Sequence, residues 1–144
     1  ACLLHDVSWR AHPDYRHEVT FESATRANLG GLTHQERVFL GMALFHRYKN
    51  SRAGSRFEDI FTILPEADHA PAEVLGKAMR FGAMFAVDAP HKQAVLTWRP
   101  KKRELHLKVR PRAADLFGEV ARVRLDSLAQ ALDATTVVNV VGQP

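Results

Sequence analysis

The sequence predicts an α+β protein, in which an all-helical bundle over residues 1–88 precedes a small ββαβ unit over residues 89–144. Three observations lead to this prediction. Apolar residues recur at a spacing of about 3.6 in the first part and at a spacing of about two in the second. The segment Asp88-Ala-Pro90 marks the boundary where the period changes. The 46% of hydrophobic residues suffices for a real core and excludes a disordered chain.

The first sixteen residues hold an unusual density of titratable side chains. The apolar positions among residues 1–7 have the spacing of about one and a half turns of a buried helix, which would place His5-Asp6 at its polar end. These apolar positions are Ala1, Leu3, Leu4 and Val7. Because the chain begins inside this expected helix, and with Ala rather than Met, we expect it to be a piece of a longer protein.

The rest of the first part should contain four helical segments. A capping box of Thr33 and Glu36 begins the second of them, which should be the central buried helix because it is apolar nearly all round. Gly30-Gly31 should end the first helix and Pro65 the third. The predicted helices are Glu18–Leu29, Thr33 to about Tyr48, Phe57–Leu64 and Ala72–Phe85.

The second part should contain three strands and one helix. The strand–helix–strand order at its end predicts a parallel pair with a right-handed crossover. The predicted elements are the strands Ala94–Trp98, Arg103–Arg110 and Thr135–Val141, and the helix Asp115–Leu132. In the middle strand, Leu105, Leu107 and Val109 should face the core. The expected apolar face of the helix holds Leu116, Val120, Val123, Leu128 and Leu132.

Charge is unevenly distributed along the chain. Residues 1–88 hold ten Lys/Arg against eleven Asp/Glu, whereas residues 89–144 hold ten against five. Attraction to a polyanion should therefore be stronger in the last third.

The single cysteine, Cys2, cannot form a disulfide within the chain, which is typical of a reducing compartment and predicts a cytoplasmic location. No apolar segment approaches the ~20 residues that would span a bilayer, so no membrane partner is expected.

An adjacent His-Asp pair at the end of an apolar helix is typical of HD-type helical bundles, where it holds a divalent metal that activates water on a phosphate ester. The alternative for His5 is a buried histidine hydrogen-bonded to its neighbours. A metal site would also need a carboxylate from the helix Ala72–Phe85, which has none after Glu73. We therefore expect no metal ligand and no catalytic residue in this chain.

Two groups of basic residues could contact phosphates. The first is a candidate cationic wall of Arg10, Arg16, His17, Arg47, Lys49 and Arg52; for the residues that end the central helix, His46 among them, the alternative is favourable charge at a helix C-terminus. The second is Lys101, Lys102, Arg103, Lys108, Arg110 and Arg112, which is either a solvated hairpin tip or a contact for nucleic acid or polyphosphate. Only Trp98 lies near this group, so a base-stacking platform is not expected.

Four segments resemble one known family. They are the run Ala1–Arg16, Gly31-Leu-Thr-His-Gln-Glu-Arg37, Phe45-His-Arg-Tyr48 and Leu75-Gly-Lys-Ala-Met-Arg80. In order and spacing they resemble the C-terminal region of the exopolyphosphatase / guanosine pentaphosphate phosphohydrolase (Ppx/GppA) family. The resemblance covers residues 1–88 well and the remainder loosely.

The resemblance implies a fold and a separation of catalytic and non-catalytic roles between domains. Such proteins carry the phosphatase site and its magnesium in two N-terminal actin-like domains, followed by an HD-like helical domain and often a small C-terminal domain. It implies that His5-Asp6 is a remnant of the HD motif, that His17 matches a following histidine, and that Ala83 stands where the distal Asp commonly lies. The HD-like bundle would then be kept without its metal chemistry.

The function implied is that of a non-catalytic C-terminal fragment that contributes polyphosphate binding and dimerisation. The parent enzyme would remove a terminal phosphate from inorganic polyphosphate or guanosine pentaphosphate with Mg²⁺, and the fragment itself would need no cofactor. Its partners would be the missing actin-like domains and a second copy in a homodimer. Two alternatives stay open, a self-sufficient metal-dependent HD phosphohydrolase and a basic nucleic-acid-binding module.

Overall fold

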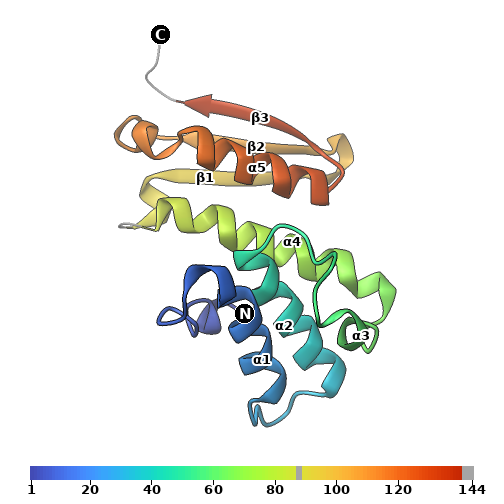
Figure 1. Cartoon of the computed structure of the whole chain (residues 1–144). Helices are drawn as coiled ribbons and strands as arrows, with labels where there is room; N and C mark the ends of the chain where they lie inside the picture. The colour runs from blue at the N-terminus through green and yellow to red at the C-terminus, as the bar shows by residue number, and fades with distance from the viewer. Residues whose placement is uncertain (87–88, 141–144) are drawn as a thin grey trace. The chain divides into compact units, whose positions relative to one another are not determined.

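The computed structural model describes residues 1–86 and 89–140. The described residues form helices and one three-stranded sheet, which confirms the α+β class (Figure 1). The chain divides into two compact units, Ala1–Met79 and Arg80–Pro144. Among the described residues, no helix combines the length and the apolar character that crossing a membrane requires.

Unit 1 is helical. Its elements are the 3₁₀ turns η1 (Cys2–Leu4) and η2 (Pro13–Tyr15), the helices α1 (Arg16–Arg26), α2 (His34–Tyr48) and α3 (Glu58–Phe61), and most of α4 (Glu66–Gly82). Helices α1 and α2 pack along each other (Figure 1). They approach closely because Gly41 has no side chain: a Cβ there would lie 2.9 Å from Cδ2 of Phe21 and 3.2 Å from Cγ2 of Thr25.

An aromatic cluster forms the core of unit 1. The ring of Phe21 lies 4.5 Å from that of Phe57 and 5.1 Å from that of Phe61, measured between centroids. The core residues are Phe21, Val38, Met42, Phe45, Phe57, Phe61, Leu64 and Ala72. These side chains join α1, α2, α3 and α4 in one apolar cluster.

The predicted start of the central helix is confirmed. The Thr33 hydroxyl accepts a hydrogen bond from the Glu36 amide at 3.2 Å, and the Thr33 amide donates to Oε2 of Glu36 at 2.7 Å. The bond from the Thr33 amide, and a second one of 2.9 Å that the Thr33 hydroxyl can donate to Oε2, lower the pKa of Glu36 because they favour its ionised form. The helix that follows buries Met42, Ala43, Leu44 and Phe45, as its apolar sequence predicts.

The predicted buried helix at the N-terminus is wrong. Residues 2–4 form a single 3₁₀ turn with no buried residue, and Leu3 is fully exposed. A run of seven residues is too short to hold a helix unless another element packs against it. His5 is exposed as well, so it is not the buried histidine that the alternative interpretation expected.

Two helix ends also differ from the prediction. Helix α1 ends at Arg26, before Gly30, because Ala27 already has an extended backbone with φ −62° and ψ 141°. Helix α4 begins at Glu66 rather than Ala72 and includes Pro71. Pro71 removes the hydrogen bond to the carbonyl four residues earlier and crowds that carbonyl, whereas the acidic side chains in the first turn favour a helix start at Glu66.

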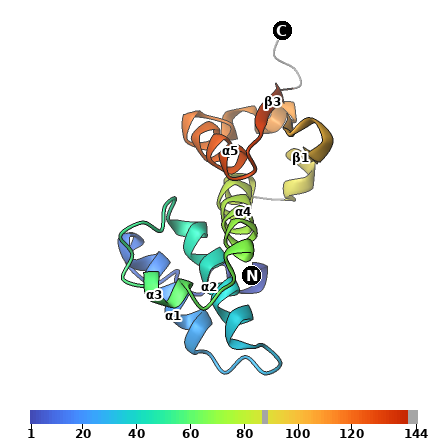
Figure 2. The ribbon, with the colours of Figure 1, turned by 90° about the vertical axis from the view of Figure 1, so that its right-hand side faces the viewer.

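Unit 2 is built on the sheet. The strands are β1 (Ala94–Arg99), β2 (Glu104–Val109) and β3 (Thr135–Val140), and helix α5 (Glu119–Ala131) connects β2 to β3. Strand β2 lies in the middle, antiparallel to β1 and parallel to β3. Helix α5 covers one face of the sheet (Figure 2). Leu105, Leu107 and Val109 of β2 are buried, as their alternation predicts. Of the predicted third strand, Val141 lies outside the described residues.

The predicted apolar face of α5 is confirmed at Leu128 and wrong at Val120 and Val123. Val120 and Val123 are 58% and 62% exposed. The buried side chains are Ala121, Leu125, Leu128 and Ala129, which follow the i, i+4, i+7, i+8 spacing of one helical face. The prediction assumed that the larger side chains would be buried, whereas the buried face of the helix has an alanine near each end.

Candidate functional site

Arg10 and Arg16 of the predicted cationic wall make local contacts. The Arg10 guanidinium lies 4.9 Å from the centroid of the Trp9 ring. Arg16 donates hydrogen bonds to the carbonyls of Ala11 at 3.1 Å and Trp9 at 2.9 Å. Arg16 therefore ties the irregular N-terminal segment to the start of α1.

His17 and Lys49 meet in space although they lie far apart in the sequence. The two side chains approach to 3.5 Å between Nε2 of His17 and Nζ of Lys49, so a neutral imidazole accepts from the ammonium. The His17 ring also packs edge-on against Phe45, with centroids 4.9 Å apart. Burial and then the neighbouring Lys49 lower the pKa of His17.

The remaining two residues of the predicted wall stack on separate rings. The Arg47 guanidinium lies 5.0 Å from the Tyr48 centroid, and that of Arg52 lies 6.0 Å from the Phe61 centroid. Of the six predicted residues, the structure thus brings His17 and Lys49 into contact.

His5 and Asp6 do not form part of a metal centre in the described residues. Nδ1 of His5 lies 2.8 Å from the Cys2 carbonyl, and the Tyr48 hydroxyl donates to the His5 carbonyl at 2.5 Å. Within residues 1–86 and 89–140, no three His, Cys, Asp or Glu side chains gather in a way that could hold a metal ion. His5 and Asp6 therefore belong to no such group in the described part of the chain.

His46 is more deeply buried than the sequence suggests. Its side chain is 1% exposed, and neither ring nitrogen has a hydrogen-bonding side-chain partner in the described structure, while the Lys49 backbone lies close enough to favour the protonated ring slightly. Burial is the main cause of its lowered pKa, so the imidazole is neutral rather than a cation at a helix end. Nearby in unit 1, the buried Lys77 lies 2.6 Å from Oε1 of Glu73. The sequence interpretation of His46 as favourable terminal charge is wrong.

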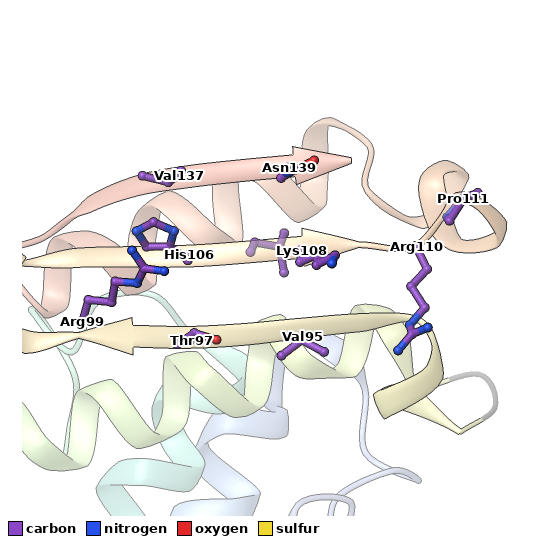
Figure 3. Close-up of a pocket in the computed structure, with 10 residues that line it drawn as sticks. Val95, Thr97, Arg99, His106, Lys108, Arg110, Pro111, Val137 and Asn139 are labelled. Carbon is purple, nitrogen blue, oxygen red and sulfur yellow. The ribbon is translucent and has the colours of Figure 1, made fainter. Parts of the chain in front are cut away.

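A pocket of about 580 Å³ lies on the face of the sheet opposite α5 (Figure 3). All three strands contribute to it, because residues two apart on a strand share a face. The side chains labelled on this face are Val95, Thr97 and Arg99 from β1, His106 and Lys108 from β2, Val137 and Asn139 from β3, and Arg110 and Pro111 after β2.

Charge on this face is predominantly positive. Glu104, which is paired in register with Arg99, accepts a hydrogen bond from His106 at 2.8 Å, and this bond is the main reason for its lowered pKa. Lys108 and Arg110 have no carboxylate partner in the described part of the chain. The face therefore offers cations that protein groups leave uncompensated.

The second predicted basic group does not stay together. Arg103 donates to Oδ2 of Asp133 at 2.7 Å and to the carbonyls of Leu132 and Asp133, and Arg112 donates to the Lys92 carbonyl. Lys108 and Arg110 line the pocket instead, together with Arg99. The sequence pattern does not group Arg99 with these residues, whereas the pairing of β1 with β2 places it on the same face.

Comparison with protein-family models matches residues 1–137 to the C-terminal domain of exopolyphosphatase. No match was found among curated proteins. The family match includes most of the chain and residues of both compact units. It agrees with the resemblance that the four sequence segments indicate. The chain belongs to the exopolyphosphatase C-terminal family.

Proposed function

We propose that this chain is the non-catalytic C-terminal part of an exopolyphosphatase-like phosphohydrolase and that it helps to bind polyphosphate. The family match over residues 1–137 is the observation that supports this proposal. The parent enzyme would remove a terminal phosphate from inorganic polyphosphate or guanosine pentaphosphate. Its actin-like domains would hold the Mg²⁺, as the family resemblance implies.

The proposed architecture is an HD-like helical domain over residues 1–88 and a ββαβ unit over residues 89–144. The helices α1, α2 and α4 with their shared apolar core support the first assignment. The order β1, β2, α5, β3 supports the second. We place the protein in the cytoplasm as a homodimer, and sedimentation of the purified chain at several concentrations tests the dimer.

The proposed polyphosphate contact in unit 1 centres on His17 and Lys49. Lys49 is exposed, and no ion pair between Lys49 and a carboxylate is found in the described residues, so its charge is available to a phosphate. Oε1 of Glu18 lies 3.8 Å from Nε2 of His17 and opposes the lowering of its pKa. A bound phosphate would add further negative charge beside the imidazole and so favour its protonation. Arg10, Arg16, Arg47 and Arg52 would complete this surface.

Two measurements on the purified 144-residue chain test this function. Labelled polyphosphate should bind, and the variant His17→Gln/Lys49→Gln should bind it several-fold more weakly, since charged contacts to phosphate dominate such affinities. Arg26→Gln removes an exposed charge from the same unit and should leave the affinity unchanged. Equal affinity of the double variant and the parent chain would exclude this surface.

Incubation of the chain with polyphosphate should release no orthophosphate. Release that co-purifies with the chain and needs an added metal ion would instead support the self-sufficient HD phosphohydrolase. No arrangement of side chains in the described residues favours that alternative.

A further inference from the structure

The open face of the sheet in unit 2 has the charge of an anion-binding surface. Helix α5 covers the opposite face, and the open face forms a pocket of about 580 Å³. Arg99, Lys108 and Arg110 line it, and all three side chains are exposed. The single carboxylate that register places on this face, Glu104, is hydrogen-bonded to His106. Positive charge therefore exceeds negative charge around the pocket.

The cations are spread along the strands rather than gathered at one point. Arg99 is paired with Glu104, and Arg110 lies six residues further along the β2 chain, with Lys108 between them (Figure 3). At about 3.4 Å per residue, the two ends of this row are about 20 Å apart. A single orthophosphate cannot contact both ends, whereas an extended anion can.

The uncharged side chains of the pocket discriminate between extended anions. Val95, Thr97 and Val137 line it, and the lining contains no Phe, Tyr or Trp; its one aromatic ring is the His106 imidazole, which is hydrogen-bonded to Glu104. Single-stranded nucleic acids bind through stacking of successive bases on several aromatic rings, and this surface offers a single ring. Asn139 and Thr97 offer hydrogen-bond donors suited to phosphate oxygens. The surface therefore suits a chain of phosphates without bases.

We propose that the open face of the sheet is a binding site for linear inorganic polyphosphate, with Lys108 and Arg110 neutralising phosphates at one end and Arg99 at the other. The choice of polyphosphate rests on the proposed function, whereas the site uses none of the residues assigned to the contact in unit 1. Hydrogen-bonding side chains of β1 and β3 orient the phosphate chain between the cations.

The test compares two variants of the 144-residue chain that lose the same charge. Lys108→Gln/Arg110→Gln should weaken binding of labelled long-chain polyphosphate about tenfold, and the salt dependence of log K should decrease by about one for each contact removed. Lys101→Gln/Arg122→Gln removes two exposed cations of unit 2 that do not line the pocket, and should change the affinity less than twofold. Equal losses in both variants, or no loss in the first, would refute the site.

Four further measurements separate this inference from the proposed function and from other ligands. If the unaltered chain binds no polyphosphate, both proposals fail. If His17→Gln/Lys49→Gln weakens binding and Lys108→Gln/Arg110→Gln does not, the proposed sheet site alone is refuted. If only Lys108→Gln/Arg110→Gln weakens binding, the proposed contact in unit 1 is refuted. A single-stranded oligonucleotide that binds as tightly and with the same variant sensitivity would replace polyphosphate as the ligand. Orthophosphate should not compete at equal phosphate concentration, and competition would contradict the extended geometry.

Discussion

His46 is a side chain whose neutral form the fold requires. It is 1% exposed, and its ring nitrogens have no side-chain partner in the described structure, with only the Lys49 backbone near enough to favour a proton on the ring. Leaving a polar group buried without a hydrogen bond typically costs about 1–3 kcal/mol. The lowered pKa means that protonation would add a further cost, because the charged imidazole is less well solvated in the folded state.

Stability should therefore decrease in mild acid. The folded-state pKa values of His46 and His17 lie below the reference value of 6.5, so below that pH the unfolded chain binds more protons. The free energy of unfolding, measured with urea at several pH values, should be constant above pH 6.5 and fall as the pH decreases through the folded pKa values. The carboxylates with lowered pKa, Glu36 and Glu104, contribute only below their reference value of 4.5.

His46→Phe should reduce this sensitivity to acid. The substitution removes two poorly satisfied buried nitrogens while keeping an aromatic ring against Phe45, so stability at pH 7 should be unchanged or higher. His34→Gln, at an exposed position of the same helix, serves as the control and should leave the profile as it is. An unchanged pH profile for His46→Phe would show that His46 does not cause the loss.

The Thr33 hydroxyl caps one of the unpaired amides at the start of α2. Thr33→Ala should lower the free energy of unfolding by about 1 kcal/mol, the usual cost of losing such a cap. Urea denaturation measures the change, and Gln35→Ala in the same turn should have a much smaller effect because Gln35 is exposed. An equal loss in both variants would mean that helix propensity, not capping, is responsible.

Helix crossings in unit 1 depend on glycine. A Cβ on Gly76 of α4 would lie 2.2 Å from the Ala43 carbonyl oxygen and 2.6 Å from Cβ of His46. Both neighbours belong to α2, so the two helices could not keep this separation with any other residue. Gly41 has the same role between α1 and α2, where the neighbouring atoms belong to side chains.

Opposite effects are expected from two substitutions in α4. Gly76→Ala should destabilise the chain by about 1–3 kcal/mol, because a backbone carbonyl must move. At Gly82, where φ is −57° and a Cβ meets nothing within 4 Å, alanine should stabilise by about 0.5–1 kcal/mol through helix propensity. Thermal denaturation of the two variants and the parent chain measures both changes in stability. A Gly76→Ala variant that is more stable than the parent chain would disprove the close crossing of α2 and α4.

Elements with a strong period could be predicted from sequence, whereas those that depend on distant contacts could not. The capping box and the apolar run fixed α2, and alternation fixed the buried face of β2. The face of α5 was missed because small side chains, Ala121 and Ala129, are buried in preference to two valines. The N-terminal segment was missed because its apolar residues have no packing partner that the sequence reveals.

At the scale of the whole molecule, charge could be predicted by region but not by site. The excess of Lys/Arg in residues 89–144 is visible in the sequence. The way in which these basic residues are distributed between contacts is not visible in the sequence, because Arg103 binds Asp133 while Lys108 and Arg110 line the pocket. Arg99 joins them only through the pairing of β1 with β2. A candidate site assembled from three strands requires their register, which local patterns do not contain.

The bond between Arg103 and the turn before β3 also bears on strand alignment. Arg103 and Asp133 both have a left-handed backbone, with φ of 50° and 48°, and the guanidinium bridges the two turns while the Arg103 carbonyl accepts from the Thr135 amide. A shift of β3 by a single position would turn Asn139 inward and Val138 outward. The contact of Arg103 with the turn therefore fixes which residues of β3 face the pocket. A substitution at the turn that shifts the register of β3 would change the side chains that line the sheet without replacing any of the lining residues.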